Sequence, residues 1–91
     1  MSLQKTEDFR IDAVCDARGL LCPLPIIRAS ERIGMMKAGE ILEVISDDPG
    51  IQEDMPAWCE SAGHRLLNLV KEGPDYRSFV RKGRRRSNRY G

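Results

Sequence analysis

The stretch "GLLCPLPII", residues 19–27, lies where the apolar residues of the chain change their spacing. Over residues 9–15 apolar and polar side chains alternate, which is typical of a strand with one buried face. Over residues 23–37 the apolar positions recur three or four residues apart, which indicates an amphipathic helix. The sequence therefore predicts a strand, a turn over "DARG" (residues 16–19) and then a helix that begins at Pro23.

The rest of the chain continues the alternation of strands and helices. "EILEVISD", residues 40–47, has apolar side chains on both faces, which predicts a central strand. Pro56 fits only the first turn of a helix, so we expect a loose turn over residues 49–53 and a helix over residues 54–62 that stops at Gly63. "HRLLNLVKE" (64–72) and "YRSFVRK" (76–82), joined by "GPD", predict an antiparallel hairpin.

This order of elements, βαβαββ, predicts a two-layer α/β sandwich. Right-handed crossovers make the first three strands run in the same direction and place both helices on one face of a four-stranded mixed sheet. A chain of 91 residues, 41% of them hydrophobic, has the size of one small domain. We expect a flexible N-terminus over residues 1–8, the folded domain over residues 9–83 and a basic flexible tail over residues 84–91.

Charge is unevenly distributed along the chain. Residues 1–80 hold nine basic and fourteen acidic residues, a net charge of −5, whereas residues 81–91 hold six basic and no acidic residues, a net charge of +6. The tail is either a solubilising end or a docking arm for RNA or an acidic protein. The chain has no apolar run that could span a membrane and no secretory signal, so we expect a cytoplasmic protein whose cysteines are reduced.

Cys22 is the cysteine whose position suggests chemistry. Pro23 and Pro25 fix the φ angles of the predicted first helical turn, so the thiol would be held on a rigid platform. We expect the free N–H groups of Leu24 and Ile26, together with the helix dipole, to lower the pKa of the Cys22 thiol moderately. Such a thiol would be a nucleophile at neutral pH.

Other uses of the cysteines fit the spacing poorly. The pattern C-x6-C-x36-C-x4-H lacks the close ligand pairs of structural zinc sites, and Pro25 stands where a resolving cysteine would be expected, so we predict neither a metal site nor a dithiol site. His64 has no carboxylate beside it in the sequence and is interpreted as a surface or strand-end residue. Cys15 and Cys59 are interpreted as core residues. A lone exposed thiol suits the transfer of sulfur as a persulfide, which needs no cofactor.

The motif around this thiol resembles that of a known family. "DARGLLCPLP" is similar to the D-x-x-G-x-x-C-P-x-P signature of the TusA (SirA-like) sulfur carrier family, and the signature positions are Asp16, Gly19, Cys22, Pro23 and Pro25. The similarity continues through "AGEILEVISDDPG", "DMPAWCESAGH" and "YRSFVRKG", and thus covers residues 11–83. The resemblance implies a βαβαββ sandwich similar to the C-terminal domain of translation initiation factor 3.

The resemblance also implies a function. Cys22 would be the persulfide-bearing cysteine of a sulfurtransferase that acts as a carrier, loaded by a cysteine desulfurase or a rhodanese and unloaded to a DsrE-type acceptor. Family routes include thiolation of the tRNA wobble uridine, cytoplasmic sulfur oxidation and sulfur supply for molybdenum cofactor. Leu21 stands where some members involved in tRNA thiolation carry arginine, which weakens the inference of that route.

Supporting roles are expected for residues near the thiol and at the end of the last strand. Asp16 would secure the turn by hydrogen bonds to the backbone, and Gly19 would permit a conformation or a close approach that a side chain blocks. Arg18, Arg81 and Lys82 would stabilise the thiolate or dock an acidic partner. We expect a monomer that does not bind membranes.

The competing hypothesis is a nucleic-acid or ribosome-associated module that uses the basic tail. The acidic body of the chain disfavours direct binding to phosphate, and its few aromatic residues form no stacking pattern.

Overall fold

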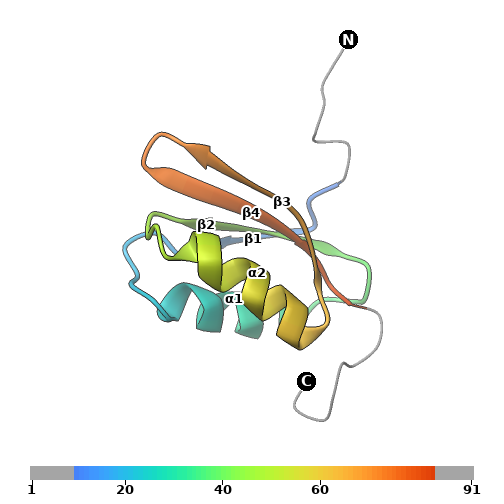
Figure 1. The fold of residues 1–91 in the computed structure, drawn as a ribbon. Helices are drawn as coiled ribbons and strands as arrows, with labels where there is room; N and C mark the ends of the chain where they lie inside the picture. The colour runs from blue at the N-terminus through green and yellow to red at the C-terminus, as the bar shows by residue number, and fades with distance from the viewer. Residues whose placement is uncertain (1–9, 84–91) are drawn as a thin grey trace.

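The computed structural model describes residues 10–83, which form one α/β unit (Figure 1). The elements follow the predicted order βαβαββ: β1 (Ala13–Asp16), α1 (Leu24–Gly34), β2 (Ile41–Ser46), α2 (Ile51–Ala62), β3 (Arg65–Glu72) and β4 (Asp75–Arg81). The predicted flexible segments, residues 1–8 and 84–91, lie outside the described residues, as does Phe9.

The four strands form one mixed sheet in the order β1-β2-β4-β3. β1 pairs with β2 in parallel, and β4 is antiparallel to both β2 and β3, so the first three strands run in one direction as predicted. Both helices cover the same face of the sheet (Figure 1). The predicted two-layer α/β sandwich with a central second strand is therefore confirmed. Neither helix within residues 10–83 is long and apolar enough to cross a membrane.

The core lies between the helices and the sheet. Its buried side chains come from both helices and from the two inner strands: Ala29, Ile33, Leu42, Val44, Ile51, Met55, Cys59, Tyr76 and Val80. Cys59 is buried within this cluster, and the partly buried Cys15 packs against it. The prediction of a core residue is confirmed for Cys59, whereas Cys15 packs against the core but is only partly buried.

The bounds of the first two elements differ from those predicted. β1 begins at Ala13 instead of Phe9, and its four residues pair with the stretch of β2 from Leu42 to Ile45. α1 begins at Leu24, with Pro23 as its N-cap, and ends at Gly34 instead of Lys37. The last turn tightens, because the N–H of Met36 donates to the carbonyl of Ile33, three residues back.

The predicted loose turn at the start of the second helix is wrong. α2 begins at Ile51 and carries Pro56 in its interior. Ile51, Met55 and Cys59 are buried at intervals of four residues, so a helix that begins early buries all three side chains. Pro56 lies on the exposed side, where it removes only one backbone hydrogen bond. Packing thus outweighs the proline, and Gly63, at φ +81°, ends the helix as predicted.

Candidate functional site

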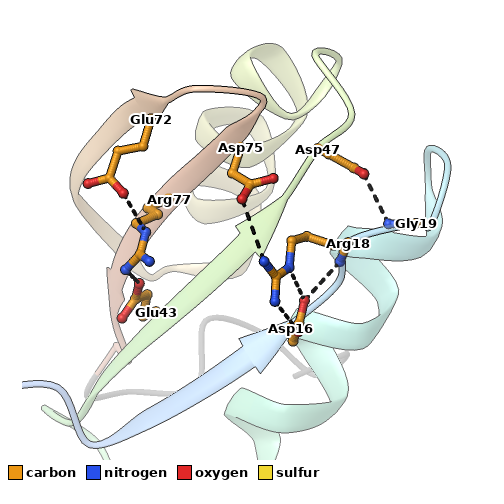
Figure 2. A network of polar contacts seen from close by, with 8 residues as sticks. All are labelled: Asp16, Arg18, Gly19, Glu43, Asp47, Glu72, Asp75 and Arg77. Carbon is orange, nitrogen blue, oxygen red and sulfur yellow. Dashed lines mark hydrogen bonds and ion pairs between the residues drawn. The ribbon is translucent and has the colours of Figure 1, made fainter.

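The loop between β1 and α1 carries Cys22 and is fastened to the loop between β2 and α2. The backbone N–H of Cys22 donates to Oδ2 of Asp48 at 2.8 Å. The backbone N–H of Gly19 donates to Oδ1 of Asp47 at 3.1 Å, as Figure 2 shows. Cys22 itself is exposed. These two bonds fix the exposed thiol relative to the start of α2.

Asp16 and Arg18 form the base of the same loop. Oδ1 of Asp16 accepts the backbone N–H of Arg18 at 3.2 Å, which is the turn-securing role predicted for Asp16. The Arg18 guanidinium also donates to both carboxylate oxygens of Asp16, at 2.9 and 2.8 Å, and lies 3.6 Å from Oδ2 of Asp75 (Figure 2). The Arg18 side chain lowers the pKa of Asp16 to about 2. Arg18 is thus held by two carboxylates, and no cation is among the groups that shift the pKa of Cys22.

Gly19, Pro23 and Pro25 have distinct structural roles. Gly19 has φ +84°, and a Cβ atom there would meet nothing within 4 Å. Conformation, and not close approach, therefore requires glycine at this position. Pro23 caps α1, and Pro25, in the first turn, is fully buried. Pro25 thus anchors the start of the helix that follows the cysteine loop.

The thiol of Cys22 has a partner that the sequence motif does not contain. Sγ of Cys22 donates to Oδ2 of Asp54, in the first turn of α2, at 2.9 Å. This hydrogen bond raises the pKa of Cys22, and partial desolvation and the negative charges of Asp54 and Asp48 raise it further. In this conformation the proton stays on the sulfur.

The prediction of a lowered pKa for Cys22 is therefore wrong. It assumed free N–H groups at the start of α1, but the N–H of Leu24 donates to the Leu21 carbonyl at 2.8 Å and that of Ile26 to the Pro23 carbonyl at 3.1 Å. Asp54 was missed because it lies 32 residues away in the sequence. The available signal was "DDPG" followed by "QED", which places carboxylates at a helix start beside the cysteine loop.

Arg81 and Lys82 lie at the other end of the sheet from the thiol. Arg81 pairs with Ile41, the first residue of β2, whereas the cysteine loop adjoins the end of β2 at Ser46 (Figure 1). The six residues of β2 separate these ends by about 17 Å. Of the two roles expected for Arg81 and Lys82, stabilising the Cys22 thiolate is excluded because the strand keeps them too far away, and docking an acidic partner stays a prediction.

The other two cysteine thiols and the histidine ring have structural roles. Burial raises the pKa of Cys15, and it raises that of Cys59 to about 12, so both thiols stay protonated. Nδ1 of His64 accepts the N–H of Gly83 at 3.0 Å, which agrees with its interpretation as a strand-end residue. Within residues 10–83 no group of three histidine, cysteine or acidic side chains has the geometry to hold a metal ion.

Exposed leucines flank Cys22 in the chain. Leu21 is 73% exposed and Leu24 is 45% exposed, immediately on either side of the Cys22–Pro23 pair. Adjacent exposed apolar side chains mark interaction surfaces when they form a contiguous patch. Asp48 and Asp54 supply negative charge next to this apolar rim.

Comparisons with known proteins agree on one family. The family model described as sulfurtransferase TusA matches residues 13–82. The putative sulfur carrier protein YrkI of Bacillus subtilis (strain 168) is 42% identical over 75 residues, which cover 82% of this chain and all of YrkI. The putative sulfur carrier protein YrkF of the same strain is 46% identical over 70 residues, 77% of this chain but only 38% of YrkF.

A further relative and one solved structure extend this result. The sulfur carrier protein TusA of Pseudomonas putida (strain W619) is 39% identical over 75 residues, which cover 82% of this chain and 94% of that protein. The crystal structure of the SirA-like protein from Desulfitobacterium hafniense has the same fold, with a TM-score of 0.69 and 23% identity over 79% of this chain and 99% of that one. On the family match and the curated relatives together, the chain belongs to the TusA sulfurtransferase family.

Proposed function

We propose that this protein is a sulfur carrier in which Cys22 receives a sulfur atom as a persulfide and passes it to another protein. The observation that carries the proposal is the exposed Cys22 at the start of α1, on the signature position of a family whose curated relatives are named sulfur carriers. Cys59 is buried in the core and Cys15 is partly buried against it, so Cys22 is the exposed thiol of the described residues.

The transfer step needs no oxidant or reductant. The Cys22 sulfur attacks the outer sulfur of a donor persulfide, R–S–SH, so that a new S–S bond forms at Cys22 while the S–S bond of the donor breaks. The donor leaves as R–S⁻. Cys22 then carries –S–SH, which the acceptor's thiolate attacks in the same way.

Asp54 gives the thiol proton a route during this exchange. The proton of Cys22 lies in a hydrogen bond to Oδ2 of Asp54, so the carboxylate is the acceptor nearest to it when the sulfur attacks. The leaving donor thiolate is the stronger base and takes the proton afterwards. The net reaction of Cys–SH with R–S–SH gives Cys–S–SH and R–SH, and Asp54 is regenerated.

The surface around Cys22 suits a protein donor and a protein acceptor. Exposed Leu21 and Leu24 supply apolar contact area, and Asp48 and Asp54 favour a partner with positive charge at its centre. We propose a cysteine desulfurase or a rhodanese as the donor and a DsrE-type protein as the acceptor. tRNA thiolation, sulfur oxidation or molybdenum-cofactor synthesis in the cytoplasm would then receive the sulfur.

Loading by a cysteine desulfurase tests the proposal directly. The protein is incubated with the desulfurase, pyridoxal phosphate and cysteine, and its intact mass is measured under non-reducing conditions. We expect a gain of one sulfur atom that reductant reverses and that Cys22→Ser abolishes. Cys15→Ser and Cys59→Ser are the matched controls and should still load. Loading that persists in Cys22→Ser would overturn the proposal.

A further inference from the structure

A cleft lies at the end of the sheet farthest from Cys22. It has a volume of about 410 Å³ and is formed where the loops after α1, α2 and β4 meet. Three basic side chains, one histidine and four small residues line it, and none of these residues is acidic: Ala38, Gly39, Gly63, His64, Arg65, Arg81, Lys82 and Gly83. The cleft is therefore positively charged in a chain whose cysteine end is acidic.

Two arginines lie directly opposite each other in this cleft. Arg65 of β3 pairs with Arg81 of β4 in the antiparallel ladder, so their side chains leave the same face of the sheet. Like charges at such a position destabilise the pair. Neither arginine forms an ion pair within residues 10–83, whereas Arg18 and Arg77 are each held by two carboxylates.

The neighbouring side chains add hydrogen-bond donors to the cleft. Nδ1 of His64 accepts the Gly83 N–H, so in the neutral ring the proton is on Nε2, which is a further donor. Nζ of Lys82 donates to the Met36 carbonyl at 2.6 Å, and an ammonium group has three protons to donate. The lysine thus satisfies one carbonyl of the loop after α1 and keeps donors for a ligand.

We propose that this cleft binds a phosphate group between the guanidinium groups of Arg65 and Arg81. Guanidinium forks match the oxygens of phosphate and bind them in pairs, and a bound dianion would relieve the repulsion between the two arginines. The volume lies within the range of small-molecule sites. The phosphate would belong either to a free phosphate compound or to the backbone of an RNA strand. The site goes beyond sulfur carriage and does not depend on it, since it lies at the opposite end of β2.

Amide chemical shifts of the full chain test the proposal. Pyrophosphate and a short single-stranded RNA are titrated separately at constant ionic strength. We expect saturable shifts at Gly39, Gly63, Arg65 and Gly83, and none at Cys22. Saturation by pyrophosphate identifies a site for a small phosphate compound, and saturation by RNA alone identifies a backbone-phosphate site.

Charge variants distinguish phosphate binding in this cleft from nonspecific electrostatic attraction between the protein and an anion. Arg65→Gln with Arg81→Gln should weaken binding about tenfold or more, because two charge-assisted contacts are lost. The control is Arg28→Gln with Arg32→Gln, which removes the same charge from exposed positions on α1 and should leave binding within about twofold. The inference is overturned by an absence of saturable shifts, by equal weakening in the control, or by a polyglutamate peptide that binds as tightly as the RNA.

Discussion

Sγ of Cys22 lies 2.9 Å from Oδ2 of Asp54, and this hydrogen bond joins the start of α1 to the first turn of α2. The first turns of both helices therefore meet beside the thiol, and the positive end of a helix dipole attracts negative charge. Asp54 and Asp48 already supply the negative charge that this region attracts. Their carboxylates keep the resting thiol protonated and raise its pKa.

Replacement of Asp54 should lower the pKa of the Cys22 thiol. In Asp54→Asn the carboxylate charge is lost, and the side-chain amide can donate to a thiolate, so we expect the pKa of Cys22 to fall. The pH profile of alkylation by iodoacetamide should move to lower pH, with faster reaction at neutral pH. Sulfur loading by a desulfurase should slow at the same time if Asp54 accepts the proton.

The matched control for this change is Glu53→Gln. Glu53 lies in the same first turn of α2, is exposed and has no hydrogen bond to Cys22. Its pH profile should stay close to that of the wild type. An unchanged profile in Asp54→Asn, or an equal shift in Glu53→Gln, would show that the hydrogen bond does not control the thiol.

The fold could be predicted from the sequence because its signals are local. Alternation over residues 13–16, apolar residues on both faces of β2 and the hairpin turn at Gly73 each determine one element within a few residues. The prediction of where α2 begins was wrong because the local rule for Pro56 competes with the burial of Ile51 in the core. That competition depends on the neighbouring strands, which a short window of sequence does not contain.

Of the candidate site, only the residues of the sequence motif could be predicted from the sequence. The motif residues all lie within residues 16–25, and the structure brings them together around one loop: Asp16, Gly19, Cys22, Pro23 and Pro25. The electrostatics of the thiol depend on Asp54, from another element, and on backbone N–H groups that turn out to be paired. The distance of Arg81 from the thiol likewise follows from the strand register, which the motif does not specify.

Gly83 should not tolerate a side chain. A Cβ atom there would overlap the carbonyl oxygen of Gly63, which belongs to the backbone and cannot swing away. We expect Gly83→Ala to lower the free energy of unfolding by about 1–3 kcal/mol, measured by urea denaturation. Gly34→Ala is the control: a Cβ atom there meets nothing within 4 Å, and alanine should stabilise α1 by about 0.5–1 kcal/mol. Equal stabilities of the two variants would contradict the crowding at Gly83.

Arg77 should contribute to the stability of the fold mainly by pairing with Glu43. The Glu43 side chain is largely buried in the centre of β2, where Arg77 pairs with it and with Glu72 (Figure 2). Arg77→Leu leaves the Glu43 charge unpaired, and we expect a loss of about 1–3 kcal/mol, less than for a fully buried pair because Arg77 is partly exposed. The double variant Glu43→Leu with Arg77→Leu should recover much of this loss in a double-mutant cycle. Strict additivity of the two single changes would refute the pairing.

The stability of the protein should fall as the pH drops through the range in which histidine titrates. Burial lowers the pKa of His64 below its ordinary value of 6.5, and the positive charge of Lys82 lowers it further. Protonation of Nδ1 would break the hydrogen bond that this atom accepts from the Gly83 N–H. The unfolded chain takes up this proton at higher pH than the folded chain, so the contribution of His64 is complete above pH 6.5 and is lost as the pH falls toward the folded pKa. Urea denaturation between about pH 8 and 5 measures this loss. His64 is the only histidine of the chain, so His64→Gln should flatten the profile over this range, and a profile that keeps the wild-type slope would assign the effect to other groups.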